Sequence, residues 1–187
     1  PDTPATQTRE SRIPTPRPTR AEASDVANAI FDGTDAVMLS GETAAGQFPV
    51  EALSMMARIA DATEESRRYH EQLELATWLQ HSNDVSDLAI AIAQAARSIT
   101  ATLDISAIVA FTQSGRTARL VSKNRPPVPI FALTPSQQVA RRVSLYWGVT
   151  PLVSPHLDQM HDLDAYVRAV LPQFGFGPGC RVAMTGG

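Results

Sequence analysis

The 187-residue chain contains almost no lysine and no marked excess of either charge. All but one of its 16 basic residues are arginines, and the exception is Lys123. A mechanism that needs a lysine side chain must therefore use Lys123 or a group from elsewhere. Lys123 lies at the end of a predicted helix, where a solvated cation near the helix C-terminus is the simpler interpretation. The net charge of −3 gives no reason to expect nucleic acid or a charged membrane surface as a partner.

Cysteine and long apolar runs are also scarce. Cys180 is the single cysteine, which excludes a disulfide within the chain and a zinc site built from cysteines. We therefore expect the protein to work in the reducing cytoplasm. No apolar run approaches the roughly 18 residues of a membrane-spanning helix, so we expect no membrane partner.

The N-terminal segment predicts an extended stretch and then a helix. Residues 1–18 hold five prolines and should be extended. Thr19 and Glu22, three residues apart, form a capping-box pattern, which predicts a helix start. Gly33 predicts the end of that helix, because glycine is favoured just past the last turn.

A short strand and a second helix are predicted next. Residues 36–39 are apolar and bounded by polar residues, which is typical of a strand covered on both faces. Pro49 suits the first turn of a helix, which we expect to continue to about Tyr69. The polar segment 70–84 is a candidate domain boundary. The apolar face of the second helix should hold Val50, Leu53, Met56, Ala57 and Ala60.

Strands and helices alternate in the rest of the chain. The predicted strands cover residues 107–111, 129–133, 149–153 and 181–184. The predicted helices begin near residue 86 and then cover residues 117–124, 136–147 and 163–174. This alternation indicates a parallel sheet with helical crossovers. We therefore divide the chain into residues 1–70, a linker at 71–85 and an α/β domain at 86–187.

A hydroxyl, a glycine and a carboxylate follow the first predicted strand directly. Ser40 and Glu42 are two residues apart, so in a turn they can share one hydrogen-bond network. Two interpretations compete: hydrogen bonding within the loop that caps the next helix, and a relay that moves protons. The residues alone favour the first.

The surrounding motifs resemble the pyruvate kinase family. Residues 35–44 (DAVMLSGETA), with PVEA at 49–52, are similar to the last strand and helix of that family's catalytic barrel. Residues 17–29 (RPTRAEASDVANA) are similar to the preceding barrel helix. Residues 5–7 (ATQ) resemble the loop after the seventh barrel strand. The similarity continues through the second α/β pattern and covers nearly all of the chain.

The resemblance implies a fold and an activity. The fold is α/β: a partial (β/α)8 barrel remnant followed by a three-layer domain built on a parallel sheet. The activity is the glycolytic transfer of a phosphoryl group from phosphoenolpyruvate to ADP, which gives pyruvate and ATP, with Mg²⁺ and K⁺ as cofactors. In this family, Thr6, Ser40 and Glu42 would belong to the network that delivers a proton to the enolate. A homo-oligomer is also implied.

The family's catalytic lysine and metal ligands would lie on other barrel strands. Phosphoryl transfer depends mostly on positioning and charge stabilisation. Two strands of eight cannot close a barrel. We therefore expect this chain alone to be inactive, to bind no metal and to expose apolar faces in its first 70 residues unless something covers them.

A second motif joins the strand at 107–111 to the helix that follows. Backbone N–H groups, hydroxyls and a guanidinium converge there, which suits a phosphate, although a simple N-cap with an exposed arginine explains the residues equally well. The motif resembles the effector loop of the pyruvate kinase C-terminal domain, which implies a sugar-phosphate or nucleotide effector. The implied effector residues are Thr112, Gln113, Ser114, Gly115, Arg116 and Thr117. The alternative function is a non-catalytic module that binds a phosphorylated metabolite or forms oligomers.

Overall fold

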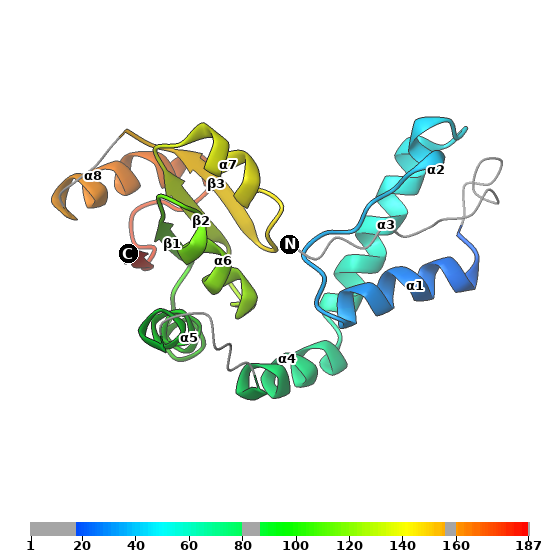
Figure 1. Ribbon diagram of the computed structural model, residues 1–187, viewed down its shortest axis with the longest axis horizontal. Coiled ribbons are helices and arrows are strands. Elements are labelled where there is room, and N and C mark those ends of the chain that lie inside the picture. The colour runs from blue at the N-terminus through cyan, green and yellow to red at the C-terminus, as the bar shows by residue number, and fades with distance from the viewer. Residues whose placement is uncertain (1–17, 80–86, 156–159, 187) are drawn as a thin grey trace. The chain divides into compact units, whose positions relative to one another are not determined.

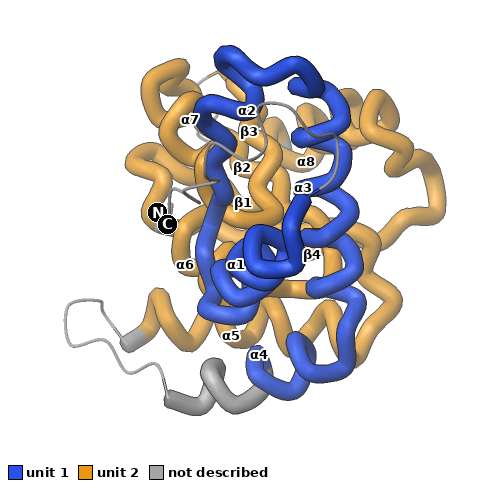
Figure 2. Tube along the Cα trace, turned by 90° about the vertical axis from the view of Figure 1, so that its right-hand side faces the viewer, with its two compact units in different colours: residues 1–80 blue, residues 81–187 orange. Residues whose placement is uncertain are grey.

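A computed structural model of the chain describes residues 18–79, 87–155 and 160–186. The chain divides into two compact units, residues 1–80 and 81–187 (Figure 2). None of the helices within the described ranges is long and apolar enough to cross a membrane.

Helices make up the first unit (Figure 1). They are α1 (Arg20–Phe31), α2 (Gly41–Ala44), α3 (Pro49–Glu64) and α4 (Arg67–Leu79). The capping box at the start of α1 is confirmed, because the Glu22 carboxylate accepts from the Thr19 backbone N–H at 2.8 Å and the Thr19 hydroxyl accepts from the Glu22 N–H at 3.3 Å. Gly33 follows the helix with φ of 84°, as predicted for a residue just past the last turn.

The core of the first unit lies between α1, α3 and α4. Four side chains form its buried cluster: Val26, Ile30, Met56 and Tyr69. The predicted apolar face of α3 is wrong at Val50 and Leu53, which are 71% and 56% exposed, and at Ala57, which is also exposed. It is confirmed at Met56, which the helix buries together with Ala52. The expectation of exposed apolar faces in this unit is therefore confirmed.

The predicted strand at 36–39 is not formed as a strand. Met38 alone carries an isolated β-bridge, and the residues around it have no regular secondary structure. A barrel strand is held by hydrogen bonds to a neighbour on each side. The described part of the first unit contains no strand that could supply them.

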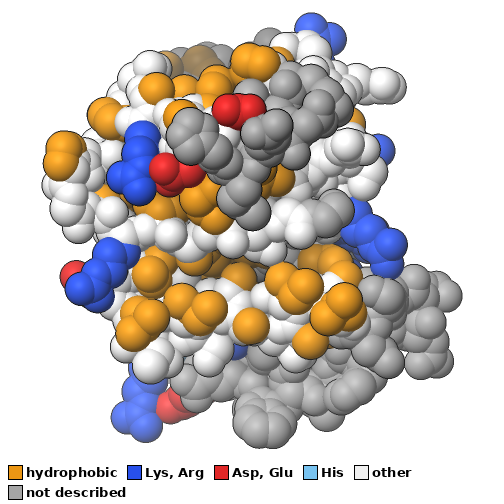
Figure 3. Space-filling model, turned by 90° about the vertical axis from the view of Figure 1, so that its left-hand side faces the viewer, with side chains coloured by type: hydrophobic (Ala, Val, Ile, Leu, Met, Phe, Trp, Pro, Cys, Tyr) orange, Lys and Arg blue, Asp and Glu red, His pale blue; other side chains and the backbone are white. Residues whose placement is uncertain are grey.

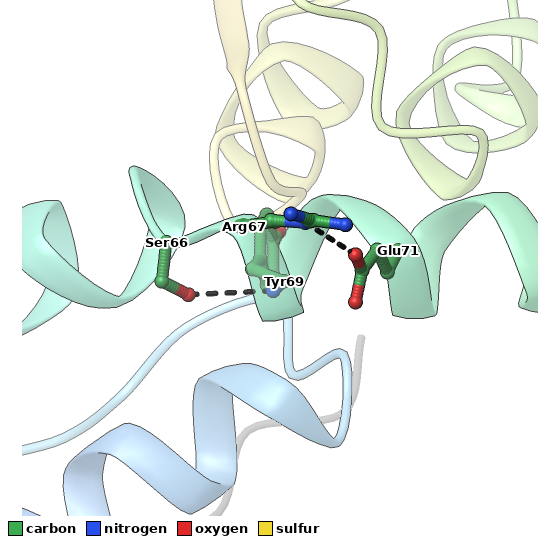
Figure 4. Close-up of polar contacts among 4 residues, drawn as sticks. All are labelled: Ser66, Arg67, Tyr69 and Glu71. Atoms are coloured by element: carbon green, nitrogen blue, oxygen red, sulfur yellow. Dashed lines mark hydrogen bonds and ion pairs between the residues drawn. The ribbon is translucent and has the colours of Figure 1, made fainter.

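The helix predicted from Pro49 to about Tyr69 is broken at Glu65–Ser66. The Ser66 hydroxyl donates to the Thr63 carbonyl at 2.7 Å and accepts from the Tyr69 backbone N–H at 3.3 Å (Figure 4). The Tyr69 N–H also donates to the Ser66 carbonyl at 3.1 Å, so the hydroxyl adds a second acceptor for an N–H at the start of α4. Helix α4 then occupies residues 71–79 of the segment that we predicted as a linker.

The first turns of α4 also carry an exposed ion pair. The Arg67 guanidinium donates to the Glu71 carboxylate at 2.6 Å, one turn along the helix (Figure 4). Pairs of this kind stabilise a helix by only about 0.3–0.5 kcal/mol. Helix α4 therefore depends more on the burial of Tyr69 than on this pair.

The second unit is built on a parallel sheet in the strand order β3-β2-β1-β4. Its strands are β1 (Ala107–Phe111), β2 (Ile130–Thr134), β3 (Val149–Val153) and β4 (Val182–Gly186). Its helices are α5 (Asp87–Thr102), α6 (Arg116–Lys123), α7 (Gln137–Val143), α8 (Met160–Val170) and the 3-10 helix η2 (Leu171–Phe174).

Helices cover both faces of this sheet. Ile108 and Ala110 of β1 face the cluster built with α5, α6 and α7. Ala107 and Val109, the alternate residues, face the cluster built with α8 and η2. Side chains on a strand point alternately to the two faces, so β1 is enclosed completely. The predicted three-layer α/β arrangement is confirmed.

One predicted helix of the second unit is too long. We predicted a helix at 136–147, but α7 ends at Val143. The turn that follows brings Trp147 to the end of α6, where its carbonyl accepts from the Ser122 hydroxyl at 2.6 Å and its ring lies 4.8 Å from the Arg125 guanidinium carbon. Such contacts with residues more than 20 positions away are not visible in a local pattern.

We predict that Ser122→Ala destabilises the second unit by about 1–3 kcal/mol, because the buried hydroxyl holds the Trp147 carbonyl. Ser144→Ala is the matched control, since the exposed Ser144 hydroxyl donates only locally, to the Arg141 carbonyl. Its effect should stay within about 0.5 kcal/mol. Urea unfolding followed by circular dichroism measures both, and equal losses in the two variants would contradict the prediction.

Candidate functional site

Two of the three residues predicted for the barrel site lie in the described part of the chain. Ser40 stands at the N-cap position of α2 and is exposed. Glu42 follows in the first turn of that helix and is only 3% exposed. Thr6 lies outside the described residues.

The turn at Ser40 brings its backbone to the Glu42 carboxylate. The Ser40 N–H donates to Glu42 Oε2 at 3.0 Å. The Ser40 carbonyl accepts from the N–H groups of Thr43 and Ala44, at 3.2 and 3.0 Å. The Ser40 side chain makes no capping hydrogen bond to α2, so the structure does not support capping by that hydroxyl. The contact of the buried Glu42 carboxylate with the Ser40 N–H is hydrogen bonding within the loop, as in the first of the two interpretations.

The described residues do not fit a metal centre. Mg²⁺ prefers several oxygen ligands, mostly carboxylates and water. Across residues 18–79, 87–155 and 160–186, no group of three or more histidine, cysteine, aspartate or glutamate side chains could hold a metal ion.

The second predicted site, the loop Thr112–Thr117, joins β1 to α6. The buried Thr112 hydroxyl accepts from the Gly115 N–H at 2.8 Å and so fixes the loop from inside. Gly115 has φ of 84°, and a Cβ built on it would lie 2.8 Å from Val143 Cγ1. Both the left-handed backbone and the approach of α7 therefore require glycine at this position.

The remaining residues of this loop face outward to different extents. Gln113, Ser114 and Arg116 are exposed, and Thr117 is half-buried. The Arg116 N–H points to the Ser114 hydroxyl, 3.4 Å away. The six predicted residues thus divide into two that build the loop, Thr112 and Gly115, and others whose polar groups can reach a ligand.

Sequence reasoning missed Arg142, which also belongs to this loop. Its guanidinium donates to the Ser114 carbonyl, although the two residues are 28 positions apart. Arg142 lies in the last turn of α7, where a basic residue is common near a helix C-terminus. No local signal distinguishes it from Arg141 beside it. The sheet order would have been needed to place α7 against this loop.

The position of β1 in the sheet adds to the case for a ligand. From β1 the chain builds β2 and β3 on one side, and β4 then pairs on the other side. In open α/β sheets, ligands bind beyond the carboxyl ends of strands where the strand order reverses in this way. The loop after β1 lies at this edge, next to the end of β4, where Gly186 pairs with Phe111.

Comparisons with known proteins agree on one family. The model "Pyruvate kinase, alpha/beta domain" matches residues 90–187, and "Pyruvate kinase, barrel domain" matches residues 2–53. A pyruvate kinase from Geobacillus stearothermophilus is 49% identical over 176 residues, which are 91% of this chain and 29% of that protein. One from Agrobacterium vitis is 51% identical over 154 residues, 82% of this chain and 32% of that protein.

A solved structure is similar over almost the whole chain. The crystal structure of a pyruvate kinase from Cryptosporidium parvum matches with a TM-score of 0.87 and 35% identity, over 98% of this chain and 37% of that one. The chain spans about a third of the length of the curated relatives it matches. Because the α/β-domain model covers more than half of the chain and the barrel model covers Ser40 and Glu42, the chain belongs to the pyruvate kinase family.

Proposed function

We propose that this chain is part of a pyruvate kinase that transfers a phosphoryl group from phosphoenolpyruvate to ADP in cytoplasmic glycolysis. The observation that carries the proposal is the turn in which the backbone N–H of the exposed Ser40 donates to the buried Glu42 carboxylate, within the matched barrel segment. Mg²⁺ and K⁺ would serve the whole enzyme, with ligands outside the described residues.

In this proposal, Ser40 and Glu42 act at the protonation step. The enolate left after phosphoryl transfer needs a proton on carbon, and a positioned hydroxyl can supply one if it regains a proton from a neighbour. Glu42, only 3% exposed, holds through the 3.0 Å hydrogen bond the backbone that carries the Ser40 hydroxyl. Thr6 would belong to the same network.

We predict that this chain alone forms no ATP from phosphoenolpyruvate and ADP. The charge stabilisation that phosphoryl transfer needs would come from a lysine and metal ligands on other barrel strands. An assay that couples ATP formation to a second enzyme measures this, with an intact bacterial pyruvate kinase as positive control. Turnover above the blank, lost in Glu42→Gln, would show that the chain is sufficient and would contradict the prediction.

The loop Thr112–Thr117 supports a second candidate function, the binding of a phosphorylated metabolite. The exposed side chains of Gln113, Ser114 and Arg116 surround the start of α6, where N–H groups and the helix dipole favour an anion. The loop also lies at the edge of the sheet where the strand order reverses, and ligands bind at that edge in open α/β sheets. We propose that this loop takes the phosphate of a sugar phosphate or a nucleotide and regulates the enzyme.

Titration calorimetry with inorganic phosphate and a hexose monophosphate tests the loop. We expect Arg116→Gln to weaken phosphate binding about tenfold or more, because a hydrogen bond to a charged group contributes about 1.5–3 kcal/mol. Arg119→Gln is the matched control, since Arg119 is exposed on the same helix and lies outside the loop. Absence of binding, or equal effects of the two substitutions, would count against the assignment.

An exposed apolar ridge on α5 supports the proposed homo-oligomer. Figure 3 shows hydrophobic side chains in a row across the lower half of the molecule, along α5. Spacings of four and seven residues put them on one side of the helix. Exposed patches of this kind mark interaction surfaces. The ridge consists of Leu88 (71% exposed), Ile92 (41%), Ile99 (41%) and Leu103 (51%).

We predict that Ile99→Glu converts the oligomer to a monomer, because a buried charge in the apolar contact would lack a partner. Ser98→Glu is the matched control: it adds the same charge at the neighbouring exposed position, outside the ridge. Light scattering after size exclusion gives the mass of each variant. Equal masses for the two variants would contradict a contact through α5.

A further inference from the structure

Gly46 lies against the backbone of Glu42. A Cβ built on Gly46 would come 2.9 Å from the Glu42 carbonyl carbon, 3.0 Å from its Cα and closer still to its carbonyl oxygen. All three are backbone atoms, so no side-chain rotation can relieve the overlap. A residue with a side chain at position 46 must therefore displace the backbone of Glu42 or the turn that follows it.

This requirement for glycine is steric. Gly46 is absent from the glycines with positive φ, which include Gly33 and Gly115. Its backbone is thus open to any residue, and conformational freedom does not account for it. Glycine is required because the backbone of Glu42 occupies the space where a side chain would lie.

Helix α2 is too short to hold Glu42 by itself. It has four residues, and backbone hydrogen bonds run from Thr43 and Ala44 to Ser40 and from Ala45 to Gly41. A helix of this length is marginal without outside support. The position of the Glu42 carboxylate, which accepts from the Ser40 N–H, therefore depends on what touches its backbone from the other side.

We propose that Gly46 is a positioning residue, which keeps the Glu42 carboxylate against the Ser40 backbone. This proposal rests on the proposed function, because it takes Glu42 to matter to the reaction. The contact between Gly46 and Glu42 lies within the first unit and does not depend on that function. In this proposal, the glycine after α2 helps to place the residues that deliver the proton.

The experiment compares two glycine substitutions five positions apart. Gly46→Ala adds a methyl group against Glu42, whereas Gly41→Ala adds one where nothing lies within 4 Å. Both changes restrict the unfolded chain in the same way, so they form a matched pair. The readout is the amide proton shift of Ser40 in a pH titration of the labelled full chain by NMR. That proton is bonded to the Glu42 carboxylate, so its shift should follow the ionisation of this group.

We expect the pH-dependent shift of the Ser40 amide in the parent chain and in Gly41→Ala, and its loss in Gly46→Ala. Glu42→Gln removes the ionising group and should also abolish it, which identifies the source of the shift. The amide signals of α1 and α3 should stay in place in all variants, since a purely structural role would move them together.

Two results would overturn the inference. The first is a Ser40 response in Gly46→Ala equal to that in Gly41→Ala. The second is the collapse of the α1 and α3 signals in Gly46→Ala, which would make Gly46 a support of the whole unit. Neither touches the proposed function, because both concern only the placement of Glu42 in the first unit, whereas that function is tested by ATP formation.

Discussion

The burial of strand β1 on both faces is the constraint on which the second unit depends. Residues 107–110 are completely inaccessible, and the parallel neighbours β2 and β4 use the strand's backbone groups on both sides. No side chain in the body of this strand can meet a ligand. A side chain that contacts a ligand must therefore lie beyond the end of the strand. The first polar residue there is Thr112.

Two contacts fix the loop that follows β1. Thr112 is itself buried and uses its hydroxyl to fix Gly115, so the turn is rigid before any ligand arrives. Arg142 holds the Ser114 carbonyl from α7 and fixes the outer part of the loop. A loop braced at both points holds one arrangement, and preorganisation of this kind reduces the ordering cost of binding a ligand.

Much of this arrangement follows from local patterns, and the rest comes from tertiary contacts. The apolar run at 107–111 and the capping pair Thr19 and Glu22 give the observed elements, because burial and capping act over a few residues. The same reasoning found the segments of both candidate sites. It could not separate Thr112, which braces the loop, from Gln113, which faces solvent, because that depends on the elements packed around the strand end.

Elsewhere, local reasoning failed where a distant partner decides the structure. Ser66 breaks a long helix because it caps a new one that buries Tyr69 in the core. The apolar residues at 36–39 need neighbouring strands to become a strand, and the described first unit offers none. Arg142 looks like an ordinary basic residue at a helix end until the sheet order places α7 beside the loop.

The two candidate sites therefore have unequal support. The loop after β1 rests on an enclosed sheet, and its bracing contacts come from within its own unit. The turn at Ser40 rests on a four-residue helix and a single β-bridge, while Val50 and Leu53 on the helix that follows remain exposed. Covering these two side chains would contribute about 1.5–3 kcal/mol each. The turn at Ser40 thus lies beside apolar side chains that its own helices leave exposed, whereas the loop after β1 takes its bracing contacts from the sheet and helices of its own unit.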